Sequence, residues 1–220
     1  MANTFAPFGF QQWSGLGSSP TYEQTPALIS SSNATKIFYG DPVVYVTTSA
    51  TGYIKQATAG TVAILGVFVG CKYLSTSQKR TVWSNYWPGA DATGDVTAYV
   101  ITDPNAQFKV QTGNSSTTAT AIGNSKLGQL INLATAVDSA SGTGGSAGNT
   151  ANGLSTMYAD QNSINTTATL PFMIRSTIVD PPGTNGTDLT TPYNWIVVGF
   201  NNAMFQGGGA RTGISEGEAT

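Results

Sequence analysis

The residues best suited to acid–base chemistry in this sequence are four aspartates in or beside predicted turns. Asp91 and Asp95 flank a turn, and Asp41 and Asp103 each precede a proline. Two neighbouring carboxylates can serve as general acid and base in glycoside hydrolysis. However, aspartates in such turns usually accept hydrogen bonds from backbone N–H groups, and the spacing lacks the dense oxygen ligands of a calcium loop. We therefore expect turn stabilisation and no enzymatic activity; a glycan hydrolase using Asp91 and Asp95 is the enzymatic alternative.

Several other kinds of chemistry are excluded by residue types that are absent or rare. The sequence has no histidine, which removes Ser-His-Asp and Cys-His triads and histidine-containing metal sites. Cys71 is its single cysteine, so it forms neither an internal disulfide nor a cysteine zinc site. Its place beside an apolar run predicts a buried thiol. We expect no metal and no cofactor.

Charge and hydropathy argue against nucleic acid and membrane as partners. The net charge is −2, and the nine Lys and Arg are scattered, with Lys79-Arg80 as the adjacent pair. A phosphate-tracking basic face is therefore not expected, and Lys79-Arg80 is interpreted as a solvated turn. No stretch reaches the roughly 18 apolar residues of a membrane span, and the N-terminus lacks the pattern of a signal peptide. We expect synthesis in the cytoplasm.

Two groups of aromatic residues are the strongest candidates for binding. They are an N-terminal group of Phe5, Phe8, Phe10 and Trp13, and a central group of Trp83, Tyr86 and Trp87. The N-terminal group either packs on its own domain as an edge segment or anchors on a neighbouring subunit. The central group fits core packing, a subunit interface or a platform for sugar rings. We take all seven residues as candidates for a subunit or capsid interface.

The elements that must position these aromatics are predicted to be β-strands. Only 9% of residues are charged, against roughly 25% in an average globular protein, and Thr and Gly are abundant. Short β-branched and aromatic runs separated by Gly, Pro and Asp are typical of a β-sandwich or β-barrel. The runs are 36–39, 43–46, 53–56, 62–69, 95–101, 106–111, 169–175 and 195–200. A further run, 126–134, fits a strand or a helix and is assigned to strand.

The chain divides into three parts in this interpretation. Residues 1–30 form an extended N-terminal arm, because their aromatics have no helical period and prolines favour extended backbone. Residues 31–206 form an all-β domain with long Gly/Ser/Thr-rich loops at 112–121 and 138–153. Residues 207–220 form a flexible tail. In the run 106–111, alternation places Ala106, Phe108 and Val110 on one face and the polar residues on the other.

A series of motifs resembles structural proteins of tailed-bacteriophage heads, specifically the head decoration, or capsid cement, proteins. The motifs are Gly40–Val44, Gly52–Ile54, Ile64–Tyr73, Trp83–Gly89, Gly94–Val100, Asp103–Gln111, Asn152–Ser155, Leu170–Phe172 and Trp195–Val198. They cover most of residues 3–206. The resemblance implies a β-rich accessory subunit on the outer surface of the expanded head, with no catalytic residues to carry over.

Our leading hypothesis is therefore a non-enzymatic virion protein that bridges capsomers of the major capsid protein and stabilises the shell. It would bind as a homo-oligomer, with a trimer as the expected state, and would be made in the bacterial host cytoplasm. Contacts with two or three capsomers at once would strengthen weak individual contacts. The alternatives are a host-glycan-binding adhesin and a structural module of the head fibre or tail.

Overall fold

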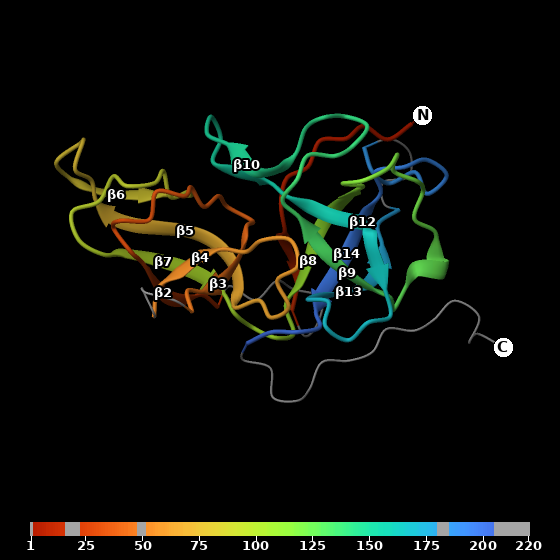
Figure 1. Cartoon of the computed structure of the whole chain (residues 1–220), viewed down its shortest axis with the longest axis horizontal. Coiled ribbons are helices and arrows are strands. Elements are labelled where there is room, and N and C mark those ends of the chain that lie inside the picture. The colour runs from red at the N-terminus through yellow and green to blue at the C-terminus, as the bar shows by residue number, and fades with distance from the viewer. Residues whose placement is uncertain (1, 16–22, 48–51, 180–184, 205–220) are drawn as a thin grey trace.

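The strand-forming runs fold into two lobes of β-structure that lie side by side (Figure 1). The computed structural model describes residues 2–15, 23–47, 52–179 and 185–204. Within these ranges the chain consists of strands, connecting loops and a short 3₁₀ turn, Asn124–Lys126. The all-β prediction is confirmed. None of the helical structure in the described part of the chain is long and apolar enough to cross a membrane.

One lobe is a six-stranded sheet that curls back on itself. Its strand order is β2-β7-β5-β3-β4, and β6 pairs with β5. The strands are β2 (Thr25–Ile29), β3 (Pro42–Tyr45), β4 (Ile54–Gln56), β5 (Gly66–Leu74), β6 (Thr81–Ser84) and β7 (Val96–Ile101). A bridge between Leu28 and Tyr53 joins β2 to the start of β4, which brings the two ends of the sheet together. The curled sheet thus has a closed inner side, and its outer side packs on the other lobe where Val44 of β3 and Val67 of β5 are buried.

The inner side of the curled sheet holds an apolar core. Along β7, Val96, Ala98 and Val100 are buried, whereas Thr97 and Tyr99 between them face outward and are partly exposed. This alternation is the two-residue period of a strand with one buried face. Phe68, Trp87 and Ile37 fill the same core, which also buries Cys71, as the sequence predicts.

The other lobe is a β-barrel. Its order is β1-β8-β12-β9-β13-β14, and a further pairing between β8 and β14 closes the ring. The strands are β1 (Gln11–Ser14), β8 (Gln107–Gly113), β9 (Leu130–Ala134), β12 (Tyr158–Asn165), β13 (Phe172–Thr177) and β14 (Trp195–Phe200). A separate hairpin of β10 (Gly145–Asn149) and β11 (Leu154–Thr156) lies above the junction of the lobes in Figure 1. The run 126–134 is confirmed as strand β9 at its C-terminal half.

The two lobes are joined by strands whose side chains alternate between two cores. On β3, Val43 packs inside the curled sheet and Val44 packs in the barrel core. On β5, Phe68 packs inside the curled sheet and Val67 packs in the barrel core. Strands buried on both faces read as continuous apolar runs, and the sequence has such runs at both places.

The expected arm is not separate from the β-domain in the described residues. Strand β1 pairs with β8, and strand β2 pairs with all of β7 except its last residue. The buried Gln111 side chain accepts a hydrogen bond from the Ala6 N–H (2.8 Å) and donates one to the Thr4 carbonyl (2.8 Å). The Asn3 amide similarly donates to the carbonyls of residues 188 and 192. Hydrogen bonds of the Gln111 and Asn3 amides thus fix residues 3–6 on the barrel, and β1 forms an edge segment of its own domain.

Other boundaries also differ from the sequence prediction. Residues 36–39 form isolated bridges at Ile37 and Tyr39 instead of a strand. The strand expected at 62–69 begins at Gly66 and continues to Leu74, which leaves Val62 exposed. Strand β8 extends into the predicted 112–121 loop, and β10 and β11 lie in and beside the 138–153 loop. The predicted tail, 207–220, lies outside the described residues.

Asp41 is a buried carboxyl group at the start of β3, beside the junction of the lobes. Its Oδ2 accepts hydrogen bonds from the Phe38 N–H and from the Gln56 side chain, both at 2.7 Å. The neighbouring Gly40 carbonyl accepts from the Phe10 N–H at 2.9 Å. Loss of hydration raises the pKa of Asp41 to about 6, because burial penalises the charged form more than these hydrogen bonds favour it.

We expect Asp41 to make stability depend on pH in the mildly acidic range. The folded state holds its proton up to about pH 6, whereas the unfolded chain loses it near the ordinary value of 3.8. The associated stabilisation is therefore present below pH 3.8 and is lost as the pH rises through about 6. Relative to an Asp41→Asn variant, the wild type should lose up to about 3 kcal/mol over this window. Urea unfolding at a series of pH values measures the difference.

An Ile131→Val variant provides the control, since a methylene removed from the barrel core should cost a similar amount at every pH. Parallel pH profiles for the wild type and Asp41→Asn would contradict the assignment.

Candidate functional site

The aspartates that could have formed an acid–base pair are held in separate turn contacts. Asp91 accepts hydrogen bonds from the Ser75 hydroxyl (2.7 Å) and the Ser77 N–H (2.9 Å). These bonds lower its pKa, with Ser75 as the largest cause. Asp95 accepts from the Tyr53 hydroxyl (2.9 Å), and Asp103 accepts from the N–H two residues later (2.8 Å). The predicted turn role is thus confirmed for Asp91 and Asp103. In the described ranges no group of three or more potential metal ligands occurs.

The central aromatic group separates into buried and exposed members. Trp87 is fully buried, donates its indole N–H to the Asn33 carbonyl (3.0 Å) and packs edge-on against Tyr73. Tyr86 lies parallel to Phe38, with 5.5 Å between ring centroids. Trp83 has 65% of its surface exposed. Core packing is therefore the correct interpretation for Trp87, and Trp83 is the member of this group that is open to a partner.

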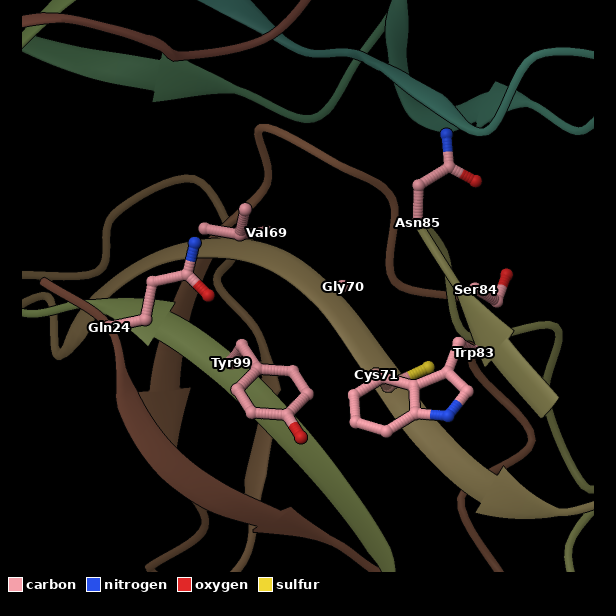
Figure 2. Close-up of a pocket in the computed structure, with 8 residues that line it drawn as sticks. All are labelled: Gln24, Val69, Gly70, Cys71, Trp83, Ser84, Asn85 and Tyr99. Carbon is pink, nitrogen blue, oxygen red and sulfur yellow. The ribbon is translucent and has the colours of Figure 1, made fainter. Parts of the chain in front are cut away.

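Trp83 lies in a groove on the outer side of the curled sheet (Figure 2). The groove has a volume of about 650 Å³. It is lined by Gln24, Val69, Gly70, Cys71, Trp83, Ser84, Asn85 and Tyr99. The Trp83 and Tyr99 ring planes are parallel within 10°, and their centroids are 5.9 Å apart. Lys72 places its ammonium group 5.0 Å from the centroid of the Trp83 ring.

The N-terminal aromatic group is also divided. Phe10 is 1% exposed and stacks on Phe172 in the barrel core, with 4.7 Å between centroids. Phe5 contacts Tyr158 edge-on at 5.3 Å and Tyr193 at 5.0 Å. Phe10 is consequently unable to act as an anchor on another subunit while it occupies this core, and Phe5 is engaged within its own chain.

Phe8 and Trp13 come together on the outside of the barrel, around Lys109. We call Phe8, Trp13, Lys109 and Trp195 the Lys109 cluster. The Lys109 ammonium lies 5.1 Å from the Phe8 ring centroid, 5.9 Å from that of Trp13 and 4.8 Å from that of Trp195. Burial lowers the pKa of Lys109, because less water reaches the ammonium group. Contacts between a cation and aromatic faces stabilise such an arrangement.

An apolar surface continues from this cluster past the edge of strand β1. Trp13 is 46% exposed, and Val179 is 49% exposed. Both line a shallow depression of about 250 Å³, together with Ser176, Thr177, Ile178 and Val197. Trp13 and Val179 thus offer a second aromatic and aliphatic surface, on the opposite lobe from Trp83.

The sequence analysis identified Trp83 on one exposed surface and Phe8 and Trp13 on the other, and it did not name Tyr99, Lys109 or Trp195 as candidates. Tyr99 and Trp195 were placed within strands, but their pairing with other strands was not predictable from local pattern. Alternation along 106–111 placed Lys109 on the polar face, and the same alternation along 95–101 could have marked Tyr99 as outward-facing. That Trp195 lies beside them depends on the register between β14 and β8, which pairs Trp195 with Gln111 and Val197 with Lys109.

Comparison with known proteins finds no matching family model, no matching curated protein and no matching solved structure. The resemblance to phage head decoration proteins therefore rests on the sequence motifs.

Stability measurements distinguish a fixed N-terminal segment from a detachable arm. Replacing Phe10 with Ala should lower the free energy of unfolding by about 3–5 kcal/mol, because it leaves a cavity beside Phe172. Replacing Trp13 with Ala should cost no more than about 1 kcal/mol, because the ring is half exposed. Chemical denaturation of both variants tests this difference. Equal, small effects would show that residues 2–15 do not pack on the barrel in solution.

Proposed function

We propose that this chain is a bacteriophage capsid decoration protein that binds the outside of the expanded head and bridges capsomers of the major capsid protein. It has no catalytic role in this proposal and is located in the virion, after synthesis in the host cytoplasm. The observation that carries the proposal is the exposed surface around Trp13 on the outside of the barrel. The motifs that resemble decoration proteins provide its second support.

The surface around Trp13 has the properties of a protein contact. Tryptophan is enriched among the residues that dominate binding energy at protein interfaces. Trp13 borders the depression that Ile178, Val179 and Val197 line. Lys109 beside it has its ammonium group against aromatic rings, and none of the described residues that line the depression has a charged side chain. A low charge density lowers the desolvation cost when such a surface is covered.

In this proposal, the exposed residues of the N-terminal segment form the anchor, and the buried ones do not. Phe5, Phe8, Phe10 and Trp13 were the expected anchors. Among them, Trp13 has the exposure that a capsid contact needs, and Phe8 supports it through the shared contact with Lys109. Deleting the segment would remove β1 and Phe10 from the barrel, so a point substitution is the appropriate test.

Bridging would arise from repetition of this contact. In the proposed homotrimer, three Trp13 surfaces would engage neighbouring capsomers. Each added contact then benefits from the effective concentration set by the first, so a weak single contact is sufficient for stable attachment. The reinforced junction would resist the outward pressure of packaged DNA.

We expect Trp13→Ala to lower occupancy on heads by about tenfold or more, since truncation of a central interface tryptophan commonly costs over 1 kcal/mol. Purified heads lacking this chain are incubated with wild-type or variant protein, separated by sedimentation and quantified by mass spectrometry against the major capsid protein. Trp83→Ala is the matched control, because it removes an exposed tryptophan from the other lobe.

The copy number of the native chain in virions tests the proposal more broadly. Copies in proportion to the capsid lattice support decoration. A dozen or a few dozen copies place the chain at a vertex, neck or tail, and absence from purified virions overturns the assignment.

A further inference from the structure

The outer side of the curled sheet carries a second site, whose geometry differs from that of a flat protein contact. Strand β5 has a bulge between Phe68 and Gly70, where two successive residues, Val69 and Gly70, both line the groove next to Trp83 and Tyr99. A side chain on Gly70 would approach the Ser84 carbonyl to 2.8 Å, so glycine lets β6 lie close to β5. The bulge and the glycine thus produce a hollow in the sheet surface with an aromatic ring on each side of it.

The two rings form an exposed platform. Figure 2 shows the Trp83 and Tyr99 rings turned the same way, with Gly70 between their strands. Their planes are parallel within 10°, and the 5.9 Å between centroids means that the rings are offset from one another. Trp83 keeps most of its surface in water. Covering the exposed apolar ring surface with an apolar ligand face would be favourable.

Neutral hydrogen-bonding groups border this platform. The Gln24 side chain lies near Tyr99 and Val69 in Figure 2, and its amide offers both donor and acceptor atoms. The Ser84 hydroxyl is also in the lining, where its oxygen accepts a hydrogen bond from the Tyr86 N–H at 3.2 Å. Among the residues that the structure describes, no Asp, Glu, Lys or Arg lines the groove. Lys72 lies at the margin, against the Trp83 ring.

We propose that the groove formed by Trp83, Tyr99 and Gln24 binds a pyranose ring of a glycan. A pyranose has an apolar C–H face that packs on an aromatic ring and an edge of hydroxyl groups that bond to amides and hydroxyls. The groove provides both parts, in a volume within the roughly 300–1,000 Å³ range of small-ligand sites. The exposed Leu28 and Leu74 do not line it; besides the two rings and the neutral polar groups, the described lining contains Val69, Gly70 and Cys71.

The site is fixed in place before any ligand binds. The Asn85 amide donates to the Asn152 carbonyl at 2.8 Å, which ties the end of β6 to the β10–β11 hairpin. Figure 2 shows Asn85 turned away from the rings, in keeping with this structural contact. The Tyr99 backbone is held between β5 and β2, where it pairs with Gly70 and Pro26. Prior ordering of the rings reduces the entropy lost on binding.

The test is a glycan array screen of the full-length chain, followed by NMR titration of the isolated protein with the best-binding oligosaccharide. The sequence has four tryptophans, so four indole N–H signals are expected, and Trp83→Phe assigns the signal of interest. Saturable movement of the Trp83 signal, with the Trp13 signal unchanged, supports the proposal. Trp83→Ala and Tyr99→Ala should each weaken binding by about tenfold or more, whereas Trp13→Ala should bind as the wild type does.

Two outcomes would overturn the assignment. The first is that no array glycan gives saturable binding; the second is that the bound glycan shifts the Trp13 signal and leaves the Trp83 signal in place. A third, Trp83→Ala abolishing attachment to heads while no glycan binds, would assign the groove to a protein partner and also reject the proposal. Far-UV circular dichroism and thermal unfolding establish that each variant is folded. Because glycan binding is measured on the isolated chain, its failure is distinct from failure of the capsid assignment.

Discussion

The fold depends on β3 and the first residues of β5, Gly66–Phe68, being buried on both faces. Val43 and Phe68 point into the curled sheet, while Val44 and Val67 on the same two strands point into the barrel. Each side chain of this size contributes about 1.5–3 kcal/mol when it is fully removed from water. Because the two strands serve both cores, the lobes are coupled through the same backbone hydrogen bonds, and neither lobe can lose these strands without opening the other. The position of each surface site relative to the other follows from this junction.

Strand pairing and buried amides, with few charged residues, hold the exposed aromatic residues of this protein in place. Charged residues make up 9% of the sequence, so little of the surface is stabilised by ion pairs, and the structure relies on strand pairing and buried amides. Gln111 and Asn3 illustrate the second device, since each satisfies several backbone groups of a segment that has no regular ladder of its own. A buried amide with both donor and acceptor used in this way fixes one conformation, because any displacement leaves unpaired polar groups.

Local sequence pattern was sufficient for the fold class and for most central strands. The runs that became β3, β7, β8 and β14 combine β-branched residues with flanking Gly, Pro or Asp, and these signals act over a few residues. Strand β12 was missed because its residues from Gln161 onward are mostly polar and lie partly or fully exposed. The sequence left open whether the N-terminal segment packs on its own domain, because the groups that fix it, Gln111 among them, are distant in sequence. The alternation in 106–111 correctly placed Phe108 and Val110 inward but gave no sign that Gln111 is buried.

The candidate sites were less predictable, since they depend on register rather than on composition. Trp83, Tyr86 and Trp87 are nearly adjacent in sequence, yet Trp83 is exposed and Trp87 is in the core. The reason is that β6 ends at Ser84, after which the chain enters the core of the curled sheet. The bulge after Phe68 also depends on register. In a regular strand, Phe68 and Cys71 would point to opposite faces of the sheet. In the structure both side chains lie in the core of the curled sheet, because the bulge adds one residue between them. That single extra residue turns Gly70 and Val69 toward the groove.

The two exposed surfaces share one further physical feature, a lysine set against tryptophan. Lys109 contacts Trp13 and Trp195, and Lys72 contacts Trp83. A lysine covers apolar surface with its methylene stem while its ammonium remains hydrated or interacts with a ring face, so it keeps an exposed tryptophan compatible with water. When a partner covers the ring, the lysine head can move aside at low cost where it is exposed, as Lys72 is, and less easily where it is partly buried, as Lys109 is. A partner can therefore displace the lysine more easily at Trp83 than at Trp13. This difference suits a reversible ligand at Trp83 and a lasting contact at Trp13.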